Sequence, residues 1–493
     1  MAMQGAESLA YAARGTVVLR LLGELCKALA GVALVPAVFA AAAGDWPFAG
    51  RSAGVGIALA ALAYASTRLP TVRRLQPNEA MAAVALGYLA TALLMSWPLS
   101  TGGLAPLDAV FHSVSAVTTT GLTTAGSVES LSMSVIFTQA WMQWCGGLAI
   151  VVLAVLLMEP GPAARRLSDT DLYESDALAG ARERARWALI IYAALTALGF
   201  VGLAALGAGW FDALVHTLSG ISTGGFSTHD DSLAGLGTWP VQGAVMLLAL
   251  AGAIPLARYR AWAPGQPGGL ERLRGFLDTE TRTLLVACAV LAAMLAATLA
   301  LAGGLPWQQA LKTAPLLAVS AQSTAGFTPV EVGTLDDTSK LLLTVSMFTG
   351  GGLGSTAGGI KIFRLLILLR LIQLSVLRPA LPPHAVAGLQ VDGRRIDDAG
   401  LAQAVGILAC FVAVVLISWL AFVVHGHDPL DSLFEVVSAT GTVGLSTGLA
   451  SPQLEPLLKA VLCADMWMGR LEVLAVLVLL HPRNWIGRRA GSP

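Results

Sequence analysis

A nine-residue segment occurs four times along the 493-residue chain. The copies align without gaps and read SAVTTTGLT (115–123), SGISTGGFS (219–227), SAQSTAGFT (320–328) and SATGTVGLS (438–446). In each copy a serine stands six residues before a shared glycine, a threonine stands two before it, and leucine or phenylalanine follows it. The glycines are 101 to 118 residues apart, a period that indicates fourfold duplication of one structural unit.

The chain around these copies is strongly apolar. Hydrophobic residues make up 56% of it and charged residues only 12%, about half the charged fraction of an average soluble domain. The sequence therefore predicts an all-α integral membrane protein with ten crossings of a hydrocarbon core about 30 Å thick. The apolar runs lie near 28–43, 54–68, 79–98, 132–158, 187–208, 240–257, 283–302, 338–375, 400–425 and 456–481.

The repeat and the crossings together predict the domain organisation. Two N-terminal transmembrane helices occupy 1–74, and four pseudo-fourfold units follow, each built as span, pore helix and span. The units are predicted at 75–165, 166–262, 263–380 and 381–493.

Basic residues concentrate in alternate connections between the runs, and such residues mark the cytoplasmic side. They are Arg68, Arg73, Arg74, Arg165, Arg166, Arg182, Arg184, Arg186, Arg258, Arg260, Arg272, Arg274, Arg378, Arg394, Arg395, Arg483, Arg488 and Arg489. The opposite connections are acidic. We therefore expect a multi-pass membrane protein, in contact with lipid, with both termini in the cytoplasm. The net charge of zero gives no reason to expect nucleic acid as a partner.

A candidate helix N-cap stands thirteen residues before each shared glycine, at Asp108, Asp212, Thr313 and Asp431. In the third copy Pro315 follows closely, and the first turn of a helix tolerates proline. About ten mostly apolar residues then lead into the repeat, and as a helix they extend only ~15 Å. Because this is half a membrane, we expect four re-entrant pore helices, each followed by an extended Thr-x-Gly loop.

Four such loops around one axis would form a cation filter. Non-helical backbone at membrane depth must be buried or line a watery cavity, and carbonyl oxygens can replace the hydration shell of potassium. The negative C-terminal ends of the pore helices also favour a cation. The alternative is four polar loops outside a helical bundle, the repeat being an evolutionary relic. The predicted filter residues are Thr118, Thr119, Thr120, Gly121, Ser222, Thr223, Gly224, Gly225, Ser323, Thr324, Ala325, Gly326, Gly441, Thr442, Val443 and Gly444.

The run at 338–375 is too long for one span and contains six glycines within 350–359. Each glycine costs a helix roughly 1 kcal/mol relative to alanine, so the helix should break midway through the membrane. A flexible loop beneath the filter is a gate, whereas a close helix crossing of small residues is the alternative. The gate residues are Gly350, Gly351, Gly352, Gly354, Ser355, Thr356, Gly358, Gly359 and Lys361.

Arg470 and Glu472 interrupt the last apolar run. A charge within a span costs at least ~2.5–3.5 kcal/mol on insertion scales and is functional by default. We expect Arg470 to face the cavity below the filter, where it holds carbonyls of the glycine loop or forms an electrostatic barrier to cations. The alternative is an ion pair with an acid, Glu472 being the nearest candidate, that locks two helices together.

These motifs resemble those of the Trk/Ktr/HKT superfamily of potassium transporters, most closely the TrkH type, over nearly the whole chain. The segments that carry the resemblance are 118–121, 222–227, 323–327, 347–361 and 469–472, together with Asp212. The resemblance implies a homodimer, an intramembrane gating loop at 350–359, and Arg470 as a barrier beneath the filter. It also implies a separate cytoplasmic TrkA-like subunit, so that nucleotide acts only through a partner.

Two positions bear on the cargo. Gln322 stands where relatives often have a basic residue, and Gly121 stands where sodium-transporting plant relatives have serine. We therefore predict potassium uptake through one channel-like pore, with potassium as the ion held at the filter and rubidium and sodium as further candidate ions. Alternatives are the potassium-binding subunit of a Kdp-type pump and a sodium-permeable or cation-symporting relative. No catalytic constellation is present, and we expect neither an enzyme nor a cofactor in this chain.

Overall fold

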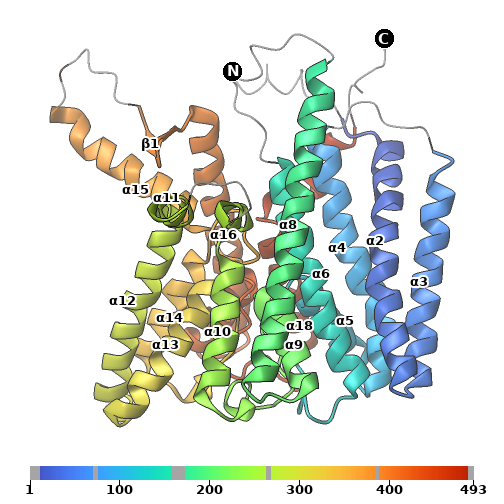
Figure 1. Ribbon diagram of the computed structural model, residues 1–493, viewed down its shortest axis with the longest axis horizontal. Coiled ribbons are helices and arrows are strands. Elements are labelled where there is room, and N and C mark those ends of the chain that lie inside the picture. The colour runs from blue at the N-terminus through green and yellow to red at the C-terminus, as the bar shows by residue number, and fades with distance from the viewer. Residues whose placement is uncertain are drawn as a thin grey trace.

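The structure is a computed structural model that describes residues 12–69, 76–157, 172–262, 268–380, 382 and 388–486. Upright helices form most of it (Figure 1), and the strands are a two-residue antiparallel pair, β1 (Gln390–Val391) and β2 (Arg394–Arg395). The fold class agrees with the sequence prediction of an all-α membrane protein. The predicted domain borders at 74/75, 165/166, 262/263 and 380/381 touch residues outside the described ranges, as do Arg73, Arg74, Arg165, Arg166, Arg488 and Arg489.

Seven helices are long and apolar enough to cross a membrane within the described ranges. They are α2 (Gly15–Ala42), α3 (Trp46–Ser66), α4 (Pro77–Leu99), α6 (Met133–Leu157), α8 (Leu172–Ala205), α12 (Thr279–Leu301) and α16 (Asp398–Val424). Apolar side chains on their outer surface are widely exposed, as with Val38 at 71% and Ile417 at 72%, because lipid rather than water is their solvent.

Three further apolar runs form broken helices. The helix α10 (Trp239–Ala253) meets the 3₁₀ helix η3 (Leu256–Trp262) at 99°. Two other pairs are α14 (Asp337–Thr349) with α15 (Ile362–Leu377), and α18 (Pro456–Arg470) with α19 (Leu474–Leu480). The glycine-rich segment predicted to break a span is the connection between α14 and α15.

Four short helices stand between the spans: α5 (Pro106–Val117), α9 (Trp210–Ile221), α13 (Trp307–Ser323) and α17 (Pro429–Thr440). The other helices are α11 (Leu270–Phe276) and the short 3₁₀ helices η1 (Ser100–Gly102), η2 (Ala234–Leu236), η4 (Val332–Thr334), η5 (Arg378–Ala380) and η6 (Pro482–Asn484).

The four units are arranged in a ring. The helix after each Thr-x-Gly loop packs against the short helix that precedes this loop in the next unit, in the pairs α6 with α9, α10 with α13, α14 with α17, and α18 with α5. The last of these pairs joins the fourth unit to the first and closes the ring. The helices α2 and α3 pack on each other and on α4, outside the four repeated units.

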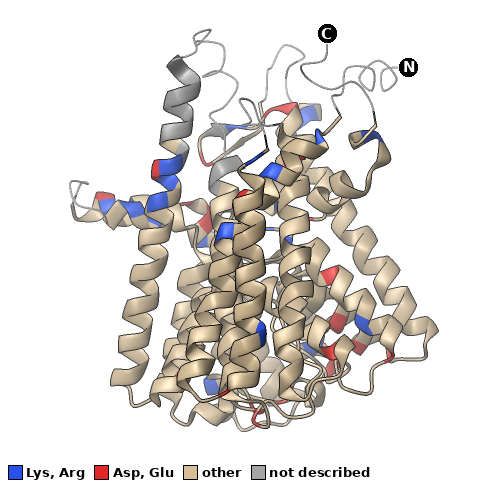
Figure 2. Cartoon of the chain, turned by 90° about the vertical axis from the view of Figure 1, so that its right-hand side faces the viewer, with Lys and Arg blue, Asp and Glu red and all other residues tan. Residues whose placement is uncertain are grey.

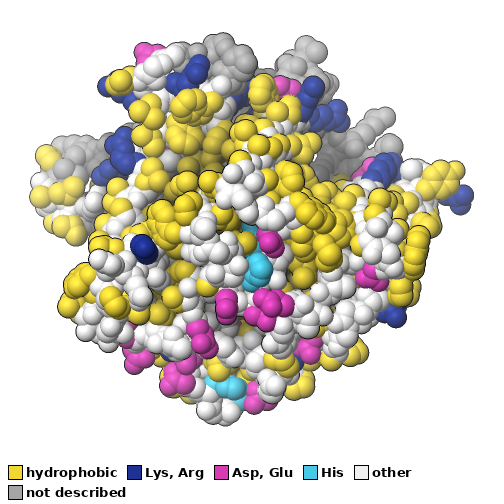
Figure 3. All heavy atoms as spheres, turned by 60° about the horizontal axis from the view of Figure 1, so that its bottom comes forward, with side chains coloured by type: hydrophobic (Ala, Val, Ile, Leu, Met, Phe, Trp, Pro, Cys, Tyr) yellow, Lys and Arg dark blue, Asp and Glu magenta, His cyan; other side chains and the backbone are white. Residues whose placement is uncertain are grey.

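The two ends of the described chain lie on one side of the molecule. The Ala13 N–H donates to the Asn484 carbonyl oxygen over 2.6 Å. Arginine and lysine gather toward this end (Figure 2). The opposite face carries acidic side chains around its centre (Figure 3).

Candidate functional site

Each of the four short helices begins before the residue predicted to cap it, so the predicted caps are wrong. The residues at the N-cap positions are Ala105, Gly209, Pro306 and Asp428. The third helical position is instead occupied by Asp108, Asp212 and Asp431. A carboxylate there stabilises the helix, because it interacts favourably with the positive N-terminal end of the helix dipole. Thr313 and Pro315 lie inside α13, because this helix is 17 residues long and starts at Trp307.

All four pore helices end in the same way. The threonine of each repeat adopts a left-handed conformation, with φ of 56° at Thr119, 53° at Thr223, 57° at Thr324 and 50° at Thr442. Its N–H and the next N–H fold back onto carbonyls of the last helical turn, the pattern of a Schellman cap. That position usually belongs to glycine, and a β-branched residue there is a genuine outlier. Strain repeated four times at one position points to a functional site.

The four shared glycines form a closed ring. Their φ values are 88° at Gly121, 83° at Gly225, 72° at Gly326 and 94° at Gly444, a region that only glycine adopts readily. A Cβ on each would come closer than 3.0 Å to the carbonyl oxygen of the residue before the glycine of the next loop. Those oxygens belong in ring order to Gly224, Ala325, Val443 and Thr120. The fourth loop therefore contacts the first, and four non-helical loops meet around one axis.

The glycine-rich connection lies directly against these loops. The Gly358 N–H donates to Thr324 Oγ1 over 2.7 Å, and the Gly359 N–H donates to the Gly441 carbonyl over 3.0 Å. A Cβ on Gly358 would come closer than 3.0 Å to the Gly441 oxygen. The connection thus touches the third and fourth loops at once, at a distance that excludes any side chain at Gly358.

The same connection is tied to its other neighbours. The Thr356 hydroxyl lies 3.0 Å from the carbonyl of Ile221, the last residue of α9. On α13, the Gln322 amide nitrogen donates to the Gly350 carbonyl over 2.7 Å, and its oxygen accepts from the Ser346 hydroxyl over 2.9 Å. Gln322 therefore anchors the start of the connection, a role that the sequence alone did not indicate.

Arg470 ends α18 and is 3% exposed. Its guanidinium donates to the Thr356 carbonyl over 2.8 Å and to the Gly146 carbonyl over 3.3 Å. It therefore holds a carbonyl of the glycine-rich connection, one of the two roles that the sequence suggested.

Glu472 does not pair with Arg470 but with Arg364 of α15, over 2.5 Å. Arg364 also donates to the Ile360 carbonyl over 3.0 Å, and the Lys361 ammonium donates to the Ala357 carbonyl. These cations and Glu472 line a cavity of about 340 Å³ beside the glycine-rich connection.

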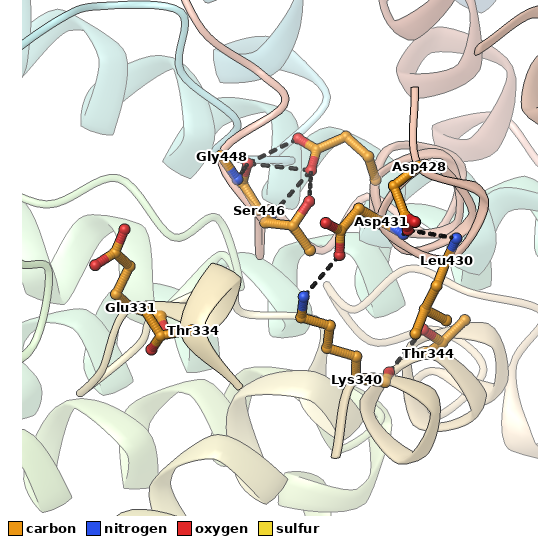
Figure 4. A network of polar contacts seen from close by, with 11 residues as sticks. Glu331, Thr334, Lys340, Thr344, Asp428, Leu430, Asp431, Ser446 and Gly448 are labelled. Carbon is orange, nitrogen blue, oxygen red and sulfur yellow. Dashed lines mark hydrogen bonds and ion pairs between the residues drawn. The ribbon is translucent and has the colours of Figure 1, made fainter. Parts of the chain in front are cut away.

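On the acidic face two ion pairs join neighbouring units. Lys340 of α14 binds Asp431 over 2.8 Å, and Lys459 of α18 binds Asp108 over 2.6 Å. Figure 4 shows the first pair beside the loop that carries Ser446 and Gly448. Both lysines are buried and are the fourth residues of their helices. A lysine inside an apolar run could have been noticed in the sequence. The sequence does not indicate which acidic residue of another unit that lysine binds.

Hydrogen bonds to a carboxylate join the outer loops of the first two units. The Ser127 hydroxyl donates to Asp230 over 2.6 Å, and so does the Val128 N–H over 2.5 Å. Partial burial raises the pKa of Asp230, but these hydrogen bonds outweigh it and hold the pKa below its ordinary value. Asp230 is thus a carboxylate that ties two outer loops together.

Comparison with known proteins agrees with this architecture. The model of the family described as "TrkH: Cation transport protein" matches residues 76–485. This chain belongs to the TrkH family of cation transport proteins. The match covers all four repeated units and leaves the two N-terminal helices outside it.

Individual TrkH relatives match over most of their length. The Trk system potassium uptake protein TrkH of Halomonas elongata is 31% identical over 486 residues, covering 95% of this chain and 99% of that protein. The Escherichia coli K12 protein of the same name is 30% identical over 402 residues, covering 77% of this chain and 79% of its own. The crystal structure of the potassium transporter TrkH from Vibrio parahaemolyticus superposes with a TM-score of 0.83 at 25% identity, covering 96% and 99% of the two chains.

Proposed function

We propose that this chain carries potassium into the cell across a bacterial inner membrane, through one pore at the centre of the four units. The observation that carries the proposal is the closed ring of filter glycines, each Cα lying against the backbone of the next loop. A ring of backbone at this depth supplies carbonyl oxygens from four sides, which is how a filter replaces the hydration shell of potassium. Relatives named as potassium uptake proteins support the choice of cargo.

The filter is formed by the sixteen residues predicted from the sequence, four from each repeat. The pore helices end at the filter loops, and the negative ends of their dipoles favour a cation there. The buried hydroxyls of Thr119 and Thr442 have no hydrogen-bond partner within the described residues. They are therefore available to an ion.

The glycine-rich connection at 350–361 is the gate, and it occludes the pore on the side that carries both described chain ends. Its hydrogen bonds to Thr324 and Gly441 support this role, because the segment cannot move without releasing the filter loops. Arg470 holds the Thr356 carbonyl from below. It also sets a positive barrier that a cation meets after leaving the filter.

The side with the chain ends is the cytoplasmic one, as the arginine-rich connections indicate. The membrane potential then drives uptake, at about 2.3 kcal/mol per charge for each 100 mV. The functional protein is a homodimer that responds to nucleotide through a separate TrkA-like subunit.

Uptake of rubidium-86 by a strain that lacks its own potassium-uptake systems tests the proposal. The wild-type chain should restore uptake, and a large excess of sodium should compete weakly. Gly121→Ser should abolish the discrimination against sodium, because the new Cβ collides with the Gly224 carbonyl and the backbone has a φ of 88°. The matched control is Gly406→Ala in α16, where a new Cβ meets no atom within 4 Å. Wild-type discrimination in the Gly121→Ser protein would refute the filter assignment.

A further inference from the structure

One buried position behind the filter recurs in every pore helix. Nine residues before each shared glycine stand His112, His216, Leu317 and Glu435, and all four side chains are 0% exposed. Three of the four are titratable groups within mostly apolar helices. Buried polar side chains are retained where they satisfy a hydrogen bond, so their contacts indicate what they hold.

The first and fourth of these side chains accept hydrogen bonds from the chain that leaves the filter. His112 Nε2 accepts from the Thr124 N–H over 3.1 Å. Glu435 accepts from the Thr447 N–H over 3.1 Å and from the Ser446 hydroxyl over 2.9 Å. Thr124 and Thr447 stand at the same repeat position, three residues after the glycine.

His216 also accepts a hydrogen bond from the chain that leaves the filter, but from a residue one position closer to the glycine. Its Nδ1 lies 2.8 Å from the Asp212 carbonyl, which only accepts, so Nδ1 carries the proton. In the neutral ring Nε2 is then an acceptor, and it lies 3.0 Å from the Ser227 hydroxyl. Ser227 stands two residues after the filter glycine, as Ser446 does in the fourth repeat.

The third repeat lacks the acceptor and the N–H donor of the bond seen in the first and fourth repeats, and its hydroxyl two residues after the glycine, on Thr328, donates to the Val330 carbonyl instead. Leu317 provides no acceptor, and Pro329, three residues after the glycine, provides no N–H. The outgoing chain is fastened to the second unit instead, where the Thr328 N–H donates to Ser232 Oγ over 3.2 Å. The acceptor is thus absent in the one repeat that has no N–H three residues after the glycine, which is expected if the hydrogen bond is the reason for the polar side chain.

The two histidines also reach the neighbouring loop. The His112 ring stacks near Phe226 with centroids 6.3 Å apart, and the His216 ring lies 5.8 Å from the Phe327 ring. Each phenylalanine directly follows the filter glycine of the next unit. One side chain therefore links the outer end of its own loop to the next loop around the ring.

We propose that His112, His216 and Glu435 are positioning residues that fix the outer ends of their filter loops, and that Glu435 thereby sets ion discrimination at the fourth loop. The inference rests on the filter function proposed above. Removing the Glu435 acceptor takes away the partner of the Thr447 N–H and of the Ser446 hydroxyl, and that loss falls on the segment two to three residues from Gly444. Figure 4 shows this outgoing segment at Ser446 and Gly448, beside the Asp431–Lys340 pair.

Three variants separate a positioning role from a requirement for charge. Glu435→Gln keeps an acceptor oxygen, Glu435→Leu introduces the residue of the third repeat, and Glu435→Leu with Thr447→Pro reproduces the pairing of Leu317 with Pro329. Purified proteins in liposomes are compared for rubidium-86 uptake and its inhibition by sodium. We expect Glu435→Gln to behave as wild type. Glu435→Leu should lose about tenfold of its discrimination, the effect of losing one hydrogen bond to a charged group, and the double variant should recover part of it.

Hydrogen–deuterium exchange at residues 442–448 gives a readout independent of transport. Exchange should be fast in Glu435→Leu and near the wild-type rate in Glu435→Gln. Wild-type discrimination and exchange in Glu435→Leu would overturn the inference, and so would equal damage in Glu435→Gln. If the wild-type protein moves no rubidium, the proposed function fails, and the exchange rates still decide whether Glu435 positions the loop.

Discussion

Gly358→Ala should open the pore. A methyl group at this position comes closer than 3.0 Å to the Gly441 carbonyl and to Thr442 Oγ1, and real Cβ atoms do not approach backbone so closely. The glycine-rich connection must therefore withdraw from the filter. It then loses the hydrogen bonds from Gly358 to Thr324 and from Gly359 to Gly441, which measure 2.7 Å and 3.0 Å.

The size of the effect follows from these two bonds. Each contributes about 0.5–1.5 kcal/mol, so the closed state loses about 1–3 kcal/mol relative to the open one. This corresponds to about a 5- to 150-fold increase in the ratio of open to closed molecules.

The assay is rubidium-86 flux into liposomes that contain the purified protein without a regulatory partner, normalised to the amount of folded protein. Gly406→Ala serves as the control, since its Cβ meets no atom within 4 Å. The initial flux of Gly358→Ala should exceed that of the control severalfold or more. Flux equal to the control, or below it, would refute the assignment of this connection as the closed gate.

Three other substitutions test the surrounding contacts. Arg470→Gln removes the proposed positive barrier and a hydrogen bond to the glycine-rich connection, so rubidium flux should rise severalfold. Unchanged flux would leave Arg470 a purely structural role. Lys340→Met leaves Asp431, whose side chain is 27% exposed, without its cation. It should lower the free energy of unfolding by about 1–3 kcal/mol, measured as a lower melting temperature, and adding Asp431→Asn should restore part of the loss. Gln322→Leu removes the donor to the Gly350 carbonyl and should raise flux without altering discrimination against sodium; altered discrimination would mean that Gln322 acts on the filter itself.

Much of the architecture can be predicted from the sequence because its physical causes are local. Apolar runs specify helices that lipid can solvate, and the fourfold recurrence of a short motif specifies equivalent units. The glycines concentrated at 350–359 remove helix propensity where the chain leaves α14 at Thr349. Each apolar run, each copy of the motif and the glycine cluster lies within one continuous stretch of chain.

The predicted caps failed for a reason that is also local. Asp108, Asp212 and Asp431 have the chemistry of an N-cap, but the first turn of a helix accepts a carboxylate at its third position as well. Spacing from the filter glycine could not distinguish the two positions. In α13 the helix extends further back, so Thr313 lies in its interior.

The sequence by itself determined that this chain is a fourfold helical membrane protein with one Thr-x-Gly loop in each unit. Only the tertiary structure decided which groups meet when the units close into a ring. Lys459 and Asp108 are 351 residues apart in the chain, and Glu472 pairs with Arg364 rather than with its neighbour Arg470. Such partners are selected by the packing of one unit against the next, and hydrophobic periodicity and local spacing do not encode that packing.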